Sequence, residues 1–317
     1  MCPEGDVGFT DRVTDSFFEA SAPPCFGQTN VTAASRETRA LRAPQVRVRT
    51  LAAVTVPAEL REYAETPDRF SAVAAGASVE RFADERVCIL QGPTWASVSG
   101  VHVEADEIVR VLAEVRDRVP REKEPIWWIG PSARPADLHA RLQALGLRDP
   151  RDRAPVLHAL TLTDEPSRPD GVAVARIETF EQFQAARELQ WDAFATPVDR
   201  RARNRARLRE DHEESQRLEI PVGFLATVDG RPAGTALAVP ADRGVFLIGG
   251  STAEWARGRG VYRALVRARW DYAVGRGTPA LVTHAMPDTS YPIVRRMGFE
   301  EVCAIRRLED PYDLRRA

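Results

Sequence analysis

The chain has 317 residues, too many for one small core and suited to two domains of roughly 100–200 residues each. Its 44 basic and 46 acidic residues nearly cancel, and its hydrophobic content of 44% is that of an ordinary globular protein. This balance gives no support to a nucleic-acid or membrane-surface partner, and no apolar run approaches the roughly 20 residues that cross a bilayer.

The N-terminal residues 1–42 mix proline, serine, threonine and charge without a sustained period, so we treat them as an extension of uncertain order. The first residues lack the basic-then-apolar order of a signal peptide. The four cysteines are scattered, and the five histidines have no ligand spacing. We therefore expect a cytoplasmic protein with free thiols and no metal.

The first predicted domain covers residues 43–166. Its expected elements are, in chain order, strands at 87–90 and 95–103, a helix at 107–119, a strand at 126–129 and a helix at 137–145. A run of turn formers and charges over 163–171 then marks the domain boundary.

The second predicted domain covers residues 171–317. Its expected elements are a strand at 172–177, a helix at 179–194, a charged helical stretch at 199–218, strands at 223–228 and 234–239 joined through Asp229-Gly230, a strand at 245–252, a helix from 261, a strand at 280–285 and a helix at 292–297. This order predicts an α/β (α+β) fold, with a mixed, mostly antiparallel sheet flanked by helices.

The two halves repeat one order of elements. In each half, strands lead into a helix, a further strand and a short helix that ends in glycine. A similar number of residues separates Glu107 from Gly146 and Val261 from Gly298. We infer an internal duplication, and hence two tandem domains of one architecture.

An arginine- and glycine-rich loop, Arg257-Gly258-Arg259-Gly260, joins the strand at 245–252 to the helix from Val261. Glycines let the backbone approach a ligand, and a helix start offers unpaired N–H groups and a positive dipole end. Together these features predict an anion site suited to a pyrophosphate, to which the two loop arginines and Arg263 add charge. A plain arginine-rich turn before a surface helix is the alternative.

The stretch from Val172 to Ile305 resembles the GNAT N-acetyltransferase superfamily. Arg257-x-x-Gly260 fits the start of that family's Q/R-x-x-G-x-G/A pyrophosphate signature, Asp229-Gly230 matches its central hairpin, and Gly298-Phe299 matches its closing helix-to-strand junction. The resemblance implies acetyl-CoA as co-substrate. It places the pantetheine arm at Ser251 and Thr252, and the phosphates at Arg257, Gly258, Arg259, Gly260, Val261, Tyr262 and Arg263.

Two positions depart from the family pattern. Tyr262 stands where the family usually has Gly or Ala, and we expect its side chain to point away from the loop. Val294 stands where the family commonly has the tyrosine that protonates the departing thiolate.

Two other residues are candidates for proton transfer. Tyr291 precedes Val294 by one helical turn and can replace the missing acid; a tyrosine with only a packing role is the alternative. His284 ends the strand beside the cofactor strand, and a histidine suits a base near neutral pH. A strand-end histidine without a catalytic role is the alternative there.

The acceptor is expected between the halves. The charged stretch over 199–219 lies where the family covers its acceptor, and its acids either attract an amine or form a solvated helix face. In the first half, residues 101–107 replace the phosphate loop with a segment that has no glycine and three acids, which would repel a pyrophosphate. We expect this half to brace the other and to form one wall of the acceptor cleft.

The sequence therefore predicts an N-acyltransferase that moves an acetyl group from acetyl-CoA to the amine of a small molecule. One alternative is a tandem transferase that uses an aminoacyl-tRNA donor, and the intact loop Arg257–Gly260 argues against it. The other is a sensor that binds acyl-CoA without turnover, which the missing tyrosine favours.

Overall fold

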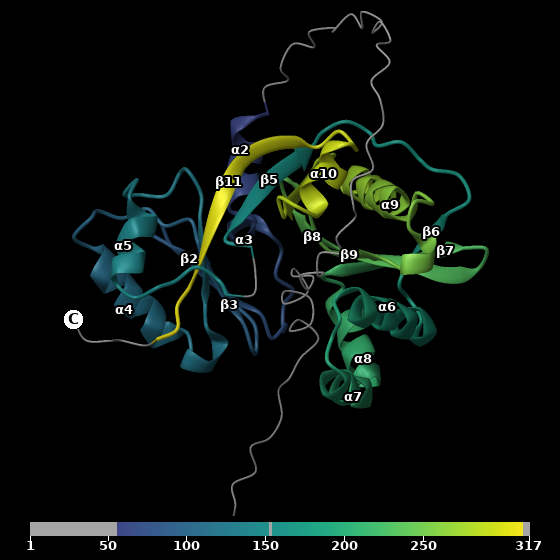
Figure 1. The fold of residues 1–317 in the computed structure, drawn as a ribbon, viewed down its shortest axis with the longest axis horizontal. Helices are drawn as coiled ribbons and strands as arrows, with labels where there is room; N and C mark the ends of the chain where they lie inside the picture. The colour runs from purple at the N-terminus through teal and green to yellow at the C-terminus, as the bar shows by residue number, and fades with distance from the viewer. Residues whose placement is uncertain (1–55, 152–153, 313–317) are drawn as a thin grey trace, which may run out of the picture.

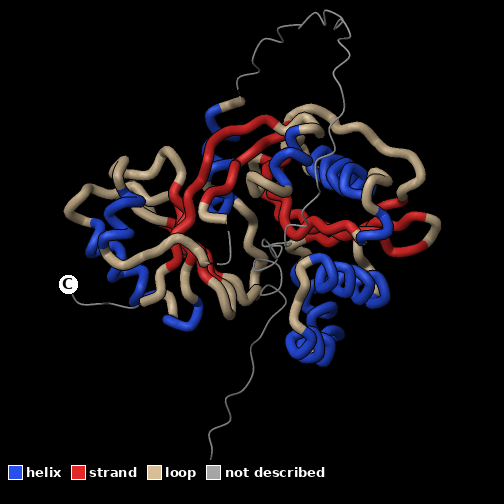
Figure 2. Tube along the Cα trace, in the orientation of Figure 1, coloured by secondary structure: helices blue, strands red, loops and turns tan. Residues whose placement is uncertain are grey.

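The computed structural model of the chain describes residues 56–151 and 154–312. The predicted extension 1–42 and the first residues of the predicted domain 43–166 lie outside these residues. One sheet of 11 strands runs through both halves of the chain, and helices cover both of its faces (Figures 1 and 2).

Both halves are built from one order of elements. The first half contains α2 (Ala58–Glu65), α3 (Pro67–Phe70), β1 (Glu80–Ala83), β2 (Cys88–Gln91), β3 (Ala96–Ser99), α4 (Ile108–Arg118), β4 (Ile126–Ile129), α5 (Leu138–Ala144) and β5 (Val156–Leu162). The second contains β6 (Ala173–Arg176), α6 (Phe180–Ala193), α7 (Val198–Ala206), α8 (Leu208–Leu218), β7 (Val222–Val228), β8 (Arg231–Ala241), β9 (Gly244–Thr252), α9 (Val261–Gly275), β10 (Leu281–Ala285), α10 (Ser290–Arg295) and β11 (Glu300–Glu309). The order from β1 to β5 recurs from β7 to β11, which confirms the predicted tandem architecture.

Two predicted elements differ from the structure. The charged stretch at 199–218 forms two helices, because Arg207 departs from helical geometry. This residue is both the C-cap of α7 and the N-cap of α8. The strand predicted at 95–103 ends at Ser99, because Gly100 takes a left-handed conformation with φ 59° and turns the chain. The predicted elements do not include β5, in which every residue from Ala159 to Leu162 is buried, so that this part shows no alternation.

The last strand of each half pairs inside the other half. The sheet order is β1-β2-β3-β4-β11-β5-β10-β9-β8-β7-β6. Strand β5, which ends the first half, lies between β10 and β11 of the second half. Strand β11, which ends the second half, lies between β4 and β5 of the first half. Each half therefore completes the sheet of the other.

The hydrophobic cores follow this exchange. Leu160 and Leu162 of β5 belong to the core of the second half, where Leu247 of β9 is among their neighbours. Leu308 of β11 belongs to the core of the first half, together with Trp127 of β4. Burial of a leucine or tryptophan side chain contributes a few kcal/mol, roughly 25 cal/mol per Å² of apolar surface, so each half stabilises the other.

Helices of both halves pack on the sheet. Helices α9 and α10 lie on one face of the second half, and α6 to α8 lie on the opposite face (Figure 1). Helix α2 packs across the exchanged strands on the α6 face, where its core neighbours are Ala159, Val282 and Ile305. The first half is thereby positioned to contribute side chains to a site on the second.

A fragment of residues 171–317 should not fold to a native-like state by itself. Without the first half, β11 loses both of its neighbours and β10 loses one, which leaves unpaired strand edges. Circular dichroism melts and amide NMR spectra of the fragment should show no cooperative transition. A longer fragment, 154–317, restores β5 and should regain part of the structure. A sharp melt of 171–317 that matches the full chain would contradict this prediction.

Candidate functional site

Strands β9 and β10 part in the middle of the second half. They pair in parallel only over Val245–Leu247 of β9, opposite Leu281–Thr283 of β10, although β9 continues to Thr252. Backbone groups of β9 beyond Leu247 therefore face a gap instead of a neighbouring strand. Peptide groups in such a gap are available to a ligand.

A bulge in β9 lies at the start of this gap. Leu237 of β8 is opposite Ile248, but the next pair joins Thr235 to Ser251, so Gly249 and Gly250 have no register partners on β8. Gly249 has φ 60°, a left-handed conformation that favours glycine. A bulge bends its strand and redirects peptide groups, which is a common feature beside binding sites.

A cavity of about 180 Å³ lies in the gap, and both halves line it. The second half supplies residues of β9 and β10, Tyr262 and Arg269 of α9, Ser290 and Val294 of α10, and Arg307 of β11. The first half supplies Glu65, Asp68, Ser97, Ser99 and Trp128. Since these residues come from both faces of the sheet, the cavity passes between the parted strands.

The arginine- and glycine-rich loop precedes α9, close to the bulge in sequence and in the fold. Gly258 and Gly260 have φ 77° and 79°, and Gly260 is the N-cap of α9. No atom lies within 4 Å of the position that a Cβ on Gly258 would occupy, so space is open before the first turn of the helix. Arg257, Arg259 and Arg263 are all exposed.

The predicted cofactor residues fit an elongated phosphate-bearing ligand. The Oγ of Ser251 is buried and has no hydrogen-bond partner, so it retains a donor and acceptor for a ligand. Arg259 contacts Asp229 at 3.2 Å, and this exposed ion pair can exchange for a phosphate at little cost. The exposed N-terminus of α9 supplies N–H groups and the positive end of its dipole.

Tyr262 turns under β9 and lines the cavity. A Cβ on Gly250 would lie 2.7 Å from its ring, so the missing side chain of that glycine makes room for the tyrosine. The Tyr262 hydroxyl lies near the guanidinium of Arg269. Of the tyrosines in the described part of the chain, Tyr262 alone is among the cavity-lining residues.

His284 lines the cavity as a neutral side chain. Its Nε2 lies 2.8 Å from the carbonyl oxygen of Ala64, and because a carbonyl can only accept, Nε2 carries the hydrogen. Its ring packs between Trp128 and Phe246, at centroid distances of 5.7 and 5.2 Å. Burial, with a contribution from the charge of Arg307, lowers the pKa of His284 to about 4. It is therefore uncharged at neutral pH, with Nδ1 as its acceptor atom.

Tyr291 faces away from the cavity. Its hydroxyl donates to Oε2 of Glu301 at 2.6 Å, and its ring packs on His158 at 4.4 Å. The hydrogen bond to Glu301 raises the pKa of Tyr291. Val294, in contrast, is buried against the cavity. The predicted catalytic role of Tyr291 stays a prediction, without a contact to the cavity.

Two carboxyl groups of the first half line the cavity, and no motif in the sequence marks either of them. Asp68 accepts a hydrogen bond from the Ser97 hydroxyl, and burial raises the pKa of Asp68. Glu65 accepts from the backbone N–H and the hydroxyl of Ser132, at 2.7 and 2.6 Å. Helix α2, which carries Glu65, packs against the exchanged strands, and α3, which carries Asp68, packs against β2 and β3, so only the tertiary structure brings these acids to the cavity.

The acids of the charged stretch divide between surface and interior. Glu210 and Glu213 are exposed. Asp211 is buried beside Arg187, and burial raises the pKa of Asp211 to about 6. Glu214 lines a second cavity, of about 430 Å³, between α6, α8 and the β7 end of the sheet. This stretch is therefore only partly a solvated face.

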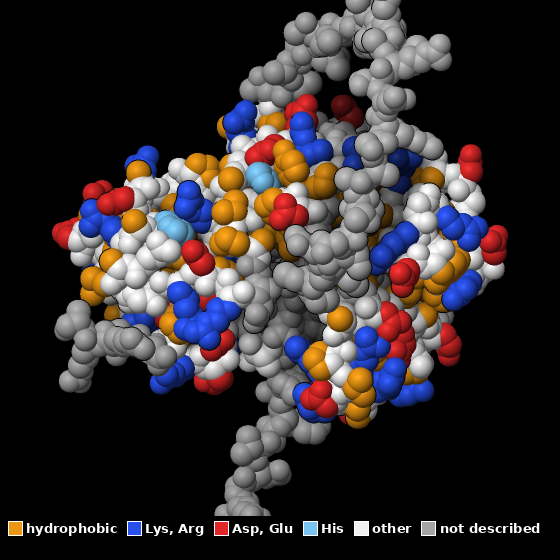
Figure 3. All heavy atoms as spheres, in the orientation of Figure 1, with side chains coloured by type: hydrophobic (Ala, Val, Ile, Leu, Met, Phe, Trp, Pro, Cys, Tyr) orange, Lys and Arg blue, Asp and Glu red, His pale blue; other side chains and the backbone are white. Residues whose placement is uncertain are grey.

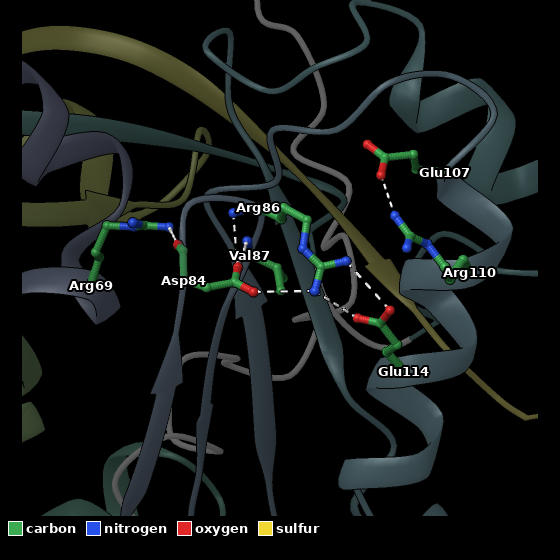
Figure 4. Close-up of polar contacts among 7 residues, drawn as sticks. All are labelled: Arg69, Asp84, Arg86, Val87, Glu107, Arg110 and Glu114. Carbon is green, nitrogen blue, oxygen red and sulfur yellow. Dashed lines mark hydrogen bonds and ion pairs between the residues drawn. The ribbon is translucent and has the colours of Figure 1, made fainter.

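In the first half, carboxylates occupy the position of the phosphate loop. The side chain of Glu107, just before α4, accepts a hydrogen bond from the backbone N–H of Glu104 at 3.1 Å and also contacts Arg110 (Figure 4). Arg86 joins Asp84 to Glu114 on the same helix (Figure 4). The start of α4 is thus acidic and already hydrogen-bonded, and that this half lacks a coenzyme A site stays a prediction.

Three further kinds of feature are relevant to function: a metal site, a membrane-spanning helix and a surface of one charge. Within 56–151 and 154–312, no group of three or more His, Cys, Asp or Glu side chains is arranged to hold a metal ion. No helix in this part of the chain has the length and apolarity to cross a membrane. On the face shown in Figure 3, basic and acidic side chains are interspersed.

Comparison with known proteins agrees with this geometry. Residues 183–299 match the Acetyltransferase (GNAT) family, and the match ends at Phe299, just before the exchanged strand β11. No curated protein matches the sequence.

Solved structures extend the likeness to both halves. A GCN5-related N-acetyltransferase from Kribbella flavida is similar at 20% identity and TM-score 0.54, over 74% of this chain and 90% of that one. A functionally unknown conserved protein from Staphylococcus epidermidis is similar at 14% identity and TM-score 0.50, over 75% and 96%. A tandem GNAT protein from the clavulanic acid biosynthesis pathway gives 14% identity and TM-score 0.49, over 80% and 88%. The first two likenesses concern the fold.

His284 should titrate near pH 4, and its protonation should destabilise the fold. An unfolded histidine has a pKa of roughly 6.5, so between pH 6.5 and 4 the unfolded chain binds a proton that the folded chain does not. The free energy of unfolding should fall as pH falls through this window. NMR titration and denaturant melts test this, with His284→Asn reducing the loss and exposed His102→Asn leaving it unchanged. A pKa near 6.5 would refute the burial argument.

Proposed function

We propose that this chain, whose residues 183–299 form a domain of the GNAT acetyltransferase family, transfers an acyl group from acyl-CoA, with acetyl-CoA the simplest donor, to the amine of a small molecule. The observation that carries the proposal is the cavity between the parted strands β9 and β10. Its walls hold both Tyr262, from the first turn of α9, and the carboxyl groups of Glu65 and Asp68 from the first half.

The second half supplies the residues that would hold coenzyme A. The start of α9 and the exposed arginines Arg257, Arg259 and Arg263 suit the phosphates. Ser251 and Thr252, in the part of β9 that does not pair with β10, suit the pantetheine arm. Acyl-CoA, when bound, supplies the thioester carbonyl to which an amine adds. Gly249 and Gly250 of the bulge line the cavity, and their peptide N–H groups are the candidate donors to the carbonyl oxygen of a bound thioester.

The first half supplies an environment for a cationic acceptor. Glu65 and Asp68 line the cavity together with the ring of Trp128, and both acidic and aromatic groups attract an ammonium ion. An amine must lose a proton before it reacts. Burial raises the pKa of Asp68, so its carboxylate is a better proton acceptor than an exposed aspartate. His284, with its pKa of about 4, is too weak a base for an alkylammonium ion and is better suited to orient the acceptor through Nδ1.

Tyr262 is the candidate proton donor for the departing thiolate. It is the cavity's phenol, whereas Tyr291 is held by Glu301 outside it. Its place at the start of α9 brings the hydroxyl to the side of the cavity from which a pantetheine arm would enter. General acid help of this kind is worth roughly 10²–10⁴-fold.

An acyl-CoA sensor is the second candidate. Val294 stands where the family commonly has its acid, and the structure turns Tyr291 away from the cavity. A thiol-release assay with acetyl-CoA and a panel of small amines separates the two functions. Turnover with any amine supports the transferase, and tight binding without turnover across the panel supports the sensor. Failure of coenzyme A to bind at all would refute both.

Gly258→Asp should weaken coenzyme A binding at least about tenfold, or ~1.4 kcal/mol, because it places an anion in the open space before α9. Gly277→Asp is the matched control, since Gly277 has the same φ of 77° and equally open surroundings at the other end of α9. Isothermal titration with coenzyme A should give a loss for the first variant only. Equal affinities for the two variants would contradict the placement of the phosphates.

Tyr262→Phe should lower kcat in the thiol-release assay by roughly 10²-fold or more and leave coenzyme A affinity nearly unchanged, because it removes one proton donor and little volume. Tyr291→Phe should leave kcat close to that of the unaltered protein, since its hydroxyl contacts Glu301 outside the cavity. A large loss with Tyr291→Phe and none with Tyr262→Phe would reverse the assignment.

A further inference from the structure

The side chain of Arg269, in the middle of α9, is buried without a counter-ion. The residue is 1% exposed. Its Nε donates to the carbonyl oxygen of Leu265 at 3.0 Å, and its Nη1 donates to that of Leu237 at 3.2 Å. Its Nη2 has no hydrogen-bond acceptor, and no carboxylate within residues 56–151 and 154–312 forms an ion pair with it. The polar groups around the charge are these carbonyl dipoles and Tyr262, whose hydroxyl lies near the guanidinium and whose ring centroid lies 5.8 Å from Cζ.

A lone buried guanidinium is costly, so its presence requires a reason. Burial lowers the pKa of Arg269, which reflects the unfavourable desolvation of its charge. Part of the reason is structural, because Nη1 satisfies the carbonyl of Leu237 beside the bulge in β9. A neutral donor such as a glutamine amide would serve that purpose without burying a charge. The structural role also leaves Nη2 without a function.

The position of Arg269 relates it to a ligand. It lines the cavity between β9 and β10 together with Gly250 and Val294. It lies two turns after Tyr262 on the same face of α9, and so belongs to the side of the cavity that α9 forms. The acids Glu65 and Asp68 come from α2 and α3 of the first half. A ligand group that reaches Arg269 therefore belongs to whatever enters beside α9.

We propose that Arg269 binds a carboxylate at the far end of the acyl chain, so that the preferred donor is the coenzyme A thioester of a short dicarboxylic acid, such as succinyl-CoA. This inference rests on the proposed function, which places the acyl group in this cavity. A carboxylate supplies the missing counter-ion and an acceptor for Nη2. An acetyl group supplies neither, and would leave the charge unsatisfied.

Donor affinity in the absence of any acceptor tests the proposal on the full chain. Succinyl-CoA and butyryl-CoA have acyl chains of similar length and differ in the terminal carboxylate. Isothermal titration should show that the unaltered protein binds succinyl-CoA at least about tenfold more tightly than butyryl-CoA. Coenzyme A itself provides the reference for the phosphate and pantetheine contacts.

Variants then assign the preference to Arg269. Arg269→Met should abolish it and leave the affinity for coenzyme A unchanged, and Arg269→Lys should retain part of it. Arg276→Met, at the exposed C-terminal end of the same helix, is the control and should keep the full preference. Thermal melts will show whether Arg269→Met folds. If it does not, the affinities of the unaltered protein and of Arg269→Lys for succinyl-CoA and butyryl-CoA test the proposal instead.

The possible outcomes separate this inference from the proposed function. If coenzyme A binds but succinyl-CoA has no advantage over butyryl-CoA, the inference is wrong and the proposed function stands. If coenzyme A does not bind, both fall. If no donor preference appears but an amine that carries a carboxylate binds better than its decarboxylated counterpart, and Arg269→Met removes that difference, the carboxylate belongs to the acceptor and the assignment to the donor is wrong.

Discussion

The exchange of β5 and β11 between the halves is the constraint on which the rest of the structure depends. Because each strand completes the other half's sheet, both cores are packed on one continuous hydrogen-bonded sheet. The exchange brings Arg307 of β11 next to Trp128 of β4. Both side chains line the cavity together with His284 of β10. Without it, the first half would have no fixed position over the parted strands.

The bulge in β9 is a local departure from regular sheet structure that the surrounding residues stabilise. Two glycines of β9 have no register partners on β8 and form the bulge. The pairing of β9 with β10 ends just before them, at Leu247. Tyr262 fills the space under Gly250, and Arg269 hydrogen-bonds the Leu237 carbonyl beside the bulge. Helix α9 therefore both begins at the arginine- and glycine-rich loop and supports the bulge beside the cavity. The proposed binding site and its supporting elements share one helix.

The two halves show how a duplicated architecture acquires different roles. At the start of α9 the backbone is open and glycine-rich, and three arginines are exposed around it. At the start of α4 the equivalent space holds carboxylates that already accept hydrogen bonds. The first half has instead placed Glu65 and Asp68 over the second half's cavity. Its contribution to the cavity is a wall with acidic groups, whose charge suits the proposed amine acceptor.

The sequence by itself determined the elements and the motif that are local in the chain. Turn residues, apolar periodicity and the glycine loop fix β7 to α9 because each depends on neighbours a few residues away, and the repeated order of elements revealed the duplication. Only the tertiary structure decided which strands exchange, since β5 and β11 pair with segments far away in sequence. It alone turned Tyr291 toward Glu301, Tyr262 under Gly250, and Asp68 into the cavity. The directions of these side chains depend on contacts between distant segments, which no local pattern records.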